Sequence, residues 1–301
     1  MDSPKGPTVE LRVPLTVAGT SCGLARFRRS YGMRIRVCLL MLGLLGMVAR
    51  THALEFAAAH PHAHDEAAKA GADFAHPLRD YSCRRLAGWS VLMEEEMTSQ
   101  DPLLAAKAQA KIEAKLKEIR QILPSHTLAR LQKVPIFFLY GEKSTHGGRP
   151  DGAEFFAQNA PDHNKSLDPR MGGAIVVYSA KHFCEMTEFG ATKVLIHEMA
   201  HAWHLTQWVE NKSDIVFAYQ TAMDKTLYRN VRTAKGSTLP EAYAAVNHLE
   251  YFAELSCVWF CGSDHFPFDG GDLKLYDPSG YQLMKRLWSE DPNRSASIAS
   301  R

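Results

Sequence analysis

Two histidines four residues apart, with a glutamate directly after the first, are the side chains of this sequence best suited to chemistry. The segment Leu195–His204 reads LIHEMAHAWH and contains the pattern H-E-x-x-H at His197, Glu198 and His201. On a helix, residues four apart lie on one face about 6 Å apart, so two imidazoles can bind one ion. The glutamate then reaches a water molecule at that ion. The spacing therefore predicts a zinc-type metal centre with Glu198 as general base.

A catalytic zinc site needs a third protein ligand and an open fourth position. Metzincin peptidases would have glycine at position 204 and histidine at position 207, where this chain has His204 and Gln207, so that class is excluded. His204 follows His197 by seven residues, or roughly 10.5 Å along a helix. This separation favours a packing or supporting role for His204 over ligation.

Two glutamates one helical turn apart, Glu250 and Glu254, are the remaining candidates for the third ligand. They lie in the segment Asn247–Phe260, NHLEYFAELSCVWF, whose other side chains are mostly apolar. An unpaired buried carboxylate is costly, so a glutamate in a buried helix requires a metal ion or another cation. The alternative interpretation places both carboxylates on a solvated helix face.

HEMAHAWH, followed further along the chain by AYAAVNHLEYFAE, resembles the gluzincin zinc metallopeptidases, in particular the catalytic domain of anthrax lethal factor and similar exported bacterial proteins. The resemblance extends in looser form over residues 80–290 and implies a zincin-like fold. It also implies that His197, His201 and Glu250 bind one Zn²⁺ per chain. Glu254 would then support one of these ligands.

Two further positions bear on this resemblance. Tyr243 precedes the expected ligand Glu250 by seven residues, where a tyrosine of the family polarises the substrate carbonyl; an ordinary surface or core aromatic is the alternative. His248 stands where lethal factor has an acidic residue, and no substrate-docking domain precedes the catalytic part. These departures leave the class intact but give no indication of the substrate.

The expected function is that of an exported zinc-dependent peptidase that acts on a peptide or protein substrate. The ion would polarise the scissile carbonyl, and Glu198 would take a proton from the attacking water and pass it to the leaving amine. The alternative is a non-catalytic exported binding module that keeps a structural zinc site. No nucleic-acid partner is expected, because 35 Lys and Arg residues are nearly balanced by 33 Asp and Glu residues, and the basic excess is confined to the N-terminal segment.

That N-terminal segment has the pattern of an export signal. Arg34 and Arg36 precede an apolar run over residues 37–49, and THA then offers a cleavage site after Ala53. The run is too short to span a membrane, so no stable membrane insertion is expected after cleavage, and the location is secreted or periplasmic. Residues 54–79 form a flexible lead-in rich in Ala and His, with metal scavenging by His60, His62 and His64 as an alternative. Residues 80–301 form a single domain.

The hydrophobic periodicity predicts an α+β domain: a small mixed sheet in the first half, packed on the active-site helix, and a helical second half. The strand Gly172–Tyr178 is further expected to pair with an extended peptide. No pairing can be chosen among Cys83, Cys184, Cys257 and Cys261. The predicted strands are 86–93, 134–140 and 172–178, the predicted helices are 102–123, 192–209, 214–231, 247–260 and 278–288, and 141–170 is a predicted loop.

Overall fold

The computed structural model describes residues 72–289. The predicted leader, its cleavage site and the three histidines of the lead-in therefore lie outside the described residues. Within the last part of the predicted lead-in, Phe74 and Arg79 are buried, so the packed body includes chain that precedes residue 80.

A five-stranded mixed sheet occupies the first half of the described chain. Its strand order is β1-β2-β3-β5-β4. Strands β2, β3 and β5 run parallel, whereas β1 pairs antiparallel with β2 and β4 pairs antiparallel with β5. The strands are β1 (Tyr81–Leu86), β2 (Trp89–Glu94), β3 (Ile136–Phe138), β4 (Ala153–Phe155) and β5 (Ile175–Val177).

One predicted strand of this sheet is confirmed with a shifted start, and two other predictions are wrong. The predicted strand 86–93 corresponds to β2, which begins later, at Trp89, because Ala87 and Gly88 have the positive φ angles of a two-residue turn between β1 and β2. β4 lies within the predicted loop 141–170, because its sequence, AEF, lacks the continuous apolar run that marks β3 and β5. Because β4 is the outer strand, β5 is paired on both sides, and Gly172–Tyr178 offers no free edge to a peptide.

Each face of the sheet is covered. Alternate side chains such as Phe138 and Val177 enter the main core, together with the helices that follow, while Phe137 and Val176 enter a smaller core on the opposite face. The helices of this half are α2 (Glu95–Gln100), α3 (Pro102–Ile122), α4 (Ser125–Leu131), α5 (Ala160–His163), α6 (Ala180–Glu185) and α7 (Glu188–Gln207), with a short 3₁₀ turn, η1 (Pro169–Met171).

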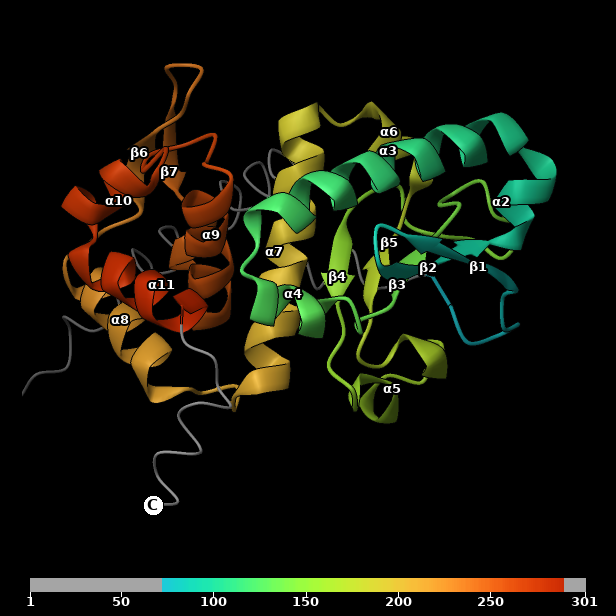
Figure 1. The fold of residues 1–301 in the computed structure, drawn as a ribbon, viewed down its shortest axis with the longest axis horizontal. Coiled ribbons are helices and arrows are strands. Elements are labelled where there is room, and N and C mark those ends of the chain that lie inside the picture. Colours follow the sequence, from blue (N-terminus) through green and yellow to red (C-terminus); the bar gives the residue numbers. More distant parts are fainter. Residues whose placement is uncertain (1–71, 290–301) are drawn as a thin grey trace, which may run out of the picture. The chain divides into compact units, whose positions relative to one another are not determined.

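Helix α7 stands between the sheet and the C-terminal helices, as Figure 1 shows, and it contacts β4, β5, α3, α4 and α9. Its extent confirms the helix predicted over 192–209, and α3 confirms the one predicted over 102–123. The C-terminal elements are α8 (Ser213–Asp224), β6 (Arg229–Arg232), β7 (Thr238–Glu241), the 3₁₀ turn η2 (Tyr243–Ala245), α9 (His248–Phe260), α10 (Gly270–Tyr276) and α11 (Pro278–Ser289).

The second half is less purely helical than predicted. The predicted helix 214–231 ends at Asp224, and positive φ angles at Thr226, Tyr228 and Asn230 turn the chain into the antiparallel β6–β7 hairpin. Helices α9 and α11 confirm the two remaining predictions. The described chain thus has a mixed sheet in its first half and a mainly helical second half, in agreement with the α+β prediction.

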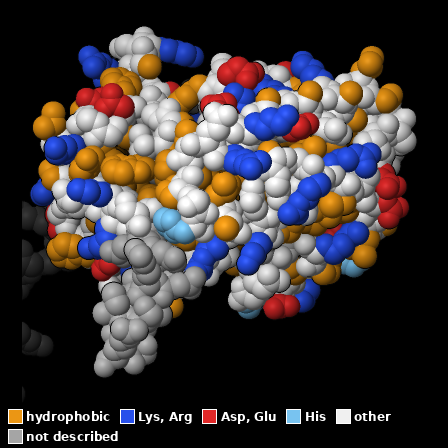
Figure 2. All heavy atoms as spheres, in the orientation of Figure 1, with side chains coloured by type: hydrophobic (Ala, Val, Ile, Leu, Met, Phe, Trp, Pro, Cys, Tyr) orange, Lys and Arg blue, Asp and Glu red, His pale blue; other side chains and the backbone are white. Residues whose placement is uncertain are grey.

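The four cysteines of the described region, Cys83, Cys184, Cys257 and Cys261, are all free thiols. None of the helices between residues 72 and 289 combines the length and apolar character that crossing a membrane demands. On the face shown in Figure 2, Lys and Arg side chains are scattered among hydrophobic and acidic ones.

Candidate metal centre

Helix α7 presents the H-E-x-x-H pattern from inside the protein. The Thr187 side chain caps the helix by accepting a hydrogen bond from the Gly190 N–H. Every residue from Ala191 to His204 is buried, because the sheet, α3, α4 and α9 surround the helix. The side chains of His197, Glu198 and His201 are therefore shielded from bulk water.

Helix α9 supplies the carboxylates. The Asn247 side chain caps it by accepting hydrogen bonds from the N–H groups of Leu249 and Glu250. The helix packs along α7, and Glu250 and Glu254, one turn apart, both face α7. Both side chains are buried, so the alternative of two solvated carboxylates is wrong.

Three ligand atoms converge between these two helices. Nε2 of His197 lies 3.1 Å from Nε2 of His201, and Oε2 of Glu250 lies 3.0 Å and 3.2 Å from these two nitrogens. Ligands placed tetrahedrally at the usual Zn–N and Zn–O bond lengths are ~3.3–3.4 Å apart. The triangle therefore has nearly the dimensions that a zinc-sized ion requires, and the three residues form a group able to hold a metal ion.

The orientation of the His197 ring is set by Glu254, which lies 3.0 Å from Nδ1. With Nδ1 as the donor, Nε2 of the neutral ring carries a lone pair that faces the Glu250 oxygen. Burial opposes the charge on His197, yet the hydrogen bonds to Glu250 and Glu254 raise its pKa to about 10. A proton and a metal ion would thus compete for the same position.

Electrostatics around Glu250 favour a bound cation. Burial on its own would raise the pKa of this carboxyl, but the charges and hydrogen bonds of His201 and His197 hold it well below its ordinary value. Glu250 is consequently an anion throughout the neutral range.

Glu198 lies beside β4, the outermost strand of the sheet. Its Oε2 accepts a hydrogen bond of 2.8 Å from the Phe155 N–H of β4, whereas Oε1 is buried without a hydrogen-bond partner. Burial raises the pKa of Glu198 to about 7. A carboxylate with one oxygen held and the other available, and with a pKa near neutrality, suits proton transfer.

Two other aromatic residues of the sequence analysis lie close by. The Tyr243 ring stacks on the His197 ring with centroids 5.8 Å apart and an interplanar angle of 29°. His204 is buried, and its ring packs edge-on against Phe252 at 5.4 Å. Burial lowers the pKa of His204 to about 4. His204 belongs to neither of the groups able to hold a metal, which agrees with the packing role expected for it.

Sequence reasoning missed three residues that complete this centre: Phe155, Lys193 and Asp264. Lys193 is buried one turn before His197 and pairs with Glu254 and Asp264. A lysine in an otherwise apolar helical segment was a signal that could have identified it. His197, Glu254 and Cys257 form a second group of metal-ligand type, but Lys193 already supplies a positive charge to Glu254 there.

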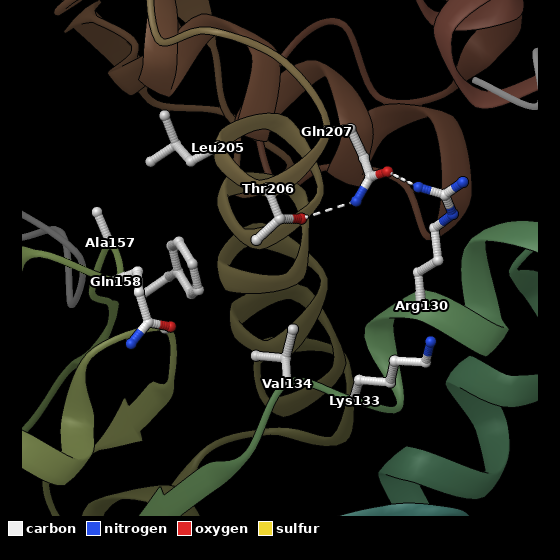
Figure 3. Close-up of a pocket in the computed structure, with 10 residues that line it drawn as sticks. Arg130, Lys133, Val134, Ala157, Gln158, Leu205, Thr206 and Gln207 are labelled. Carbon is white, nitrogen blue, oxygen red and sulfur yellow. Dashed lines mark hydrogen bonds between the residues drawn. The ribbon is translucent and has the colours of Figure 1, made fainter. Parts of the chain in front are cut away.

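A cavity of about 610 Å³ opens near the C-terminal end of α7. Figure 3 shows Leu205 of α7 on the side of Ala157 and Gln158, which follow β4, while the Thr206 hydroxyl is turned toward Gln207 and Lys133 lies on the α4 side. Phe155 also lines it, while its N–H binds Glu198. The cavity thus adjoins the sheet edge at Glu198, although none of the metal-ligand candidates lines it.

Comparison of the chain with protein-family models, with curated proteins and with solved structures finds no match in any of the three.

Proposed function

We propose that this chain is a zinc-dependent peptidase of the gluzincin type with a zincin-like fold, in which His197, His201 and Glu250 bind one Zn²⁺. The observation that carries the proposal is the triangle of Nε2, Nε2 and Oε2 atoms with sides of 3.0 to 3.2 Å. Three acceptor atoms directed at one buried point repel one another unless a cation lies between them.

The buried charges support a divalent ion. Glu198, Glu250 and Glu254 are buried carboxylates around His197, and Lys193 is a buried ammonium that pairs with Glu254. With all three carboxylates ionised, two negative charges remain after Lys193 is counted. A divalent cation cancels them, which is the compensation that buried charges require.

The role of each residue in the proposed reaction follows from the group that its side chain offers. When bound, Zn²⁺ would polarise the substrate carbonyl and make a water molecule more acidic. Glu198 Oε1 would accept the proton of that water, while the Phe155 N–H keeps Oε2 in place. The same oxygen would then deliver the proton to the leaving amine. Tyr243, stacked on His197, would donate a hydrogen bond to the developing oxyanion.

The sheet edge supports a peptide as the substrate. At the two ends of β4, the Phe156 N–H donates to the Ala174 carbonyl and the Gly152 carbonyl accepts from the Tyr178 N–H, so both point toward the β5 side. The Phe155 N–H points to the opposite side, toward Glu198. An extended peptide added to this outer strand would pass beside the carboxylate that carries the proton. We attribute peptide binding to β4 in place of the strand that the sequence suggested, and we retain export as part of the proposal.

Metal analysis and peptide cleavage test the function together. Purified protein, measured by elemental mass spectrometry, should contain about one zinc ion per chain, as a single three-ligand site requires. Glu250→Ala should lose the zinc, whereas Glu198→Gln should keep it but no longer cleave a broad peptide library. Glu113→Ala, at a surface ion pair with Lys117 on α3, is the matched control and should behave as the unmodified protein.

Three outcomes would count against the proposal. Zinc retained by Glu250→Ala would remove Glu250 from the ligand set. Absence of zinc from the unmodified protein would refute the metal centre. Bound zinc without cleavage of any peptide would favour a non-catalytic zinc-binding module.

A further inference from the structure

A buried ammonium group lies directly behind the candidate metal centre. Lys193 occupies α7 one turn before His197, and only 9% of its side chain is exposed. Its Nζ atom lies 3.3 Å from Oε2 of Glu254 and 3.0 Å from Oδ1 of Asp264. Burial on its own would lower the pKa of Lys193, but these two carboxylates raise it above its ordinary value, so the group is a permanent cation.

Glu254 is held at both of its oxygens. Oε1 lies 3.0 Å from Nδ1 of His197, and Oε2 is bound by Lys193. Burial favours the protonated form of Glu254, whereas Lys193 and His197 hold its pKa well below the usual range. These two contacts hold the Glu254 carboxylate in the position from which Oε1 reaches the His197 ring.

The position of the Glu254 carboxylate determines how the His197 ring is oriented. A carboxylate at Nδ1 can only accept, so it requires Nδ1 to carry the hydrogen and leaves Nε2 of His197 as the metal-binding nitrogen. A Glu254 side chain released from Lys193 could turn its oxygen away from Nδ1 and would no longer enforce this orientation. Partners of this kind on metal-binding histidines change metal affinity by 10–100-fold.

We infer that Lys193 is a positioning residue of the metal centre: by binding Glu254 it fixes the orientation of His197, and it raises zinc affinity without touching the ion. This inference rests on the proposed function, because it assigns to Lys193 a part in the same zinc site.

Two residues of the segment after α9, Asp264 and His265, also contact these side chains. Asp264 shares Lys193 with Glu254, and His265 is buried, with Nδ1 at 3.1 Å from Asp264 and Nε2 at 4.0 Å from Glu254. The Asp264 side chain is 57% exposed, however, and solvent screens its charge. Asp264→Asn should consequently affect zinc affinity much less than Lys193→Met does.

A double-mutant cycle tests the inference on the full-length protein. The variants are Lys193→Met, Glu254→Gln and the double substitution, which removes one positive and one negative charge and so keeps the buried charge balanced if Lys193→Met alone fails to fold. Lys115→Met is the matched control, because Lys115 is also buried between two carboxylates, Glu118 and Glu188, but lies on α3 away from the metal ligands.

Two readouts separate positioning from a merely structural role. The first is the zinc dissociation constant, measured by competition with a chromogenic chelator. The second is the visible spectrum of the protein saturated with Co²⁺ in place of zinc, which reports the geometry of the ligands. A lysine with only a structural role would change thermal stability but neither of these quantities.

We expect Lys193→Met and Glu254→Gln each to weaken zinc binding by about 10–100-fold. The double variant should bind zinc as Glu254→Gln does, because Lys193 acts only through Glu254. The cobalt spectrum should shift in all three variants and remain unchanged in Lys115→Met. Lys193→Arg, which keeps the charge, should recover part of the affinity.

Unchanged zinc affinity in Lys193→Met, or additive losses in the double variant, would overturn the inference while leaving the zinc peptidase proposal in place. An unmodified protein that binds no zinc would instead refute the proposed function, and the role of Lys193 in it. The two failures are distinguished by the zinc content of the unmodified protein.

Discussion

Replacing Glu198 by glutamine should abolish catalysis and, in the metal-free protein, increase stability. The Phe155 N–H can only donate, so the new amide must turn its oxygen toward Phe155 and its NH₂ group toward the former Oε1 position. An NH₂ group there cannot accept a proton. The loss of a general base is expected to slow peptide cleavage by about 10²–10⁴-fold or more.

The expected gain in stability follows from the burial of the Glu198 carboxyl group. Burial raises the pKa of Glu198 from 4.5 to about 7. The carboxyl therefore ionises more easily in the unfolded chain than in the fold, and the fold loses stability as the pH rises from about 4.5 through about 7. Over this shift the loss amounts to about 3 kcal/mol above pH 7. Glutamine does not ionise, so Glu198→Gln escapes the loss.

Urea unfolding of the metal-free proteins, followed by circular dichroism, measures this effect. Near pH 4.5 the two proteins should be nearly equally stable, and near pH 8 Glu198→Gln should be the more stable by about 3 kcal/mol. The control is Glu113→Gln, whose carboxyl forms a surface ion pair with Lys117; it should show no such pH-dependent gain. Equal stabilities at both pH values, or a less stable Glu198→Gln at pH 8, would refute the reasoning that burial disfavours the ionised form of Glu198.

Three further predictions concern other parts of the structure. Because Glu250 and Glu254 raise the pKa of His197 to about 10 against the effect of burial, zinc must displace a proton below that pH; titration calorimetry in buffers of different ionisation enthalpy should show about one proton released per zinc, and affinity should fall about tenfold per unit as the pH drops. Tyr243→Phe should lower kcat by about 10²–10³-fold with an unchanged zinc dissociation constant, and a loss of zinc would show that Tyr243 only supports His197. Gly280→Ala should destabilise the fold by about 1–3 kcal/mol in urea unfolding, because the added Cβ would lie 2.5 Å from Asp277 Oδ2; wild-type stability would contradict this packing.

Much of the helical framework could be predicted from the sequence. The long helices α3, α7, α9 and α11 have apolar residues at helical intervals, and the structure confirms all four. Two other elements were not predictable in this way. β4 lacks the continuous apolar run that marks the equally short strands β3 and β5, and the β6–β7 hairpin depends on positive φ angles that no periodicity reveals. The prediction that Gly172–Tyr178 pairs with a peptide failed for this reason, because β4, which was not predicted, pairs with β5.

By itself, the sequence determined the pairing of His197 with His201, because residues four apart on a helix share a face whatever the helix packs against. The part that Glu250 and Glu254 play depended on how α9 lies against α7, which only the tertiary structure decided. It places Glu250 at the two ring nitrogens that face each other and Glu254 at the opposite side of His197. The partnership of Lys193 with Glu254 also arises from this packing, because contacts between distant segments follow from the burial of whole helix faces and leave no local spacing in the chain.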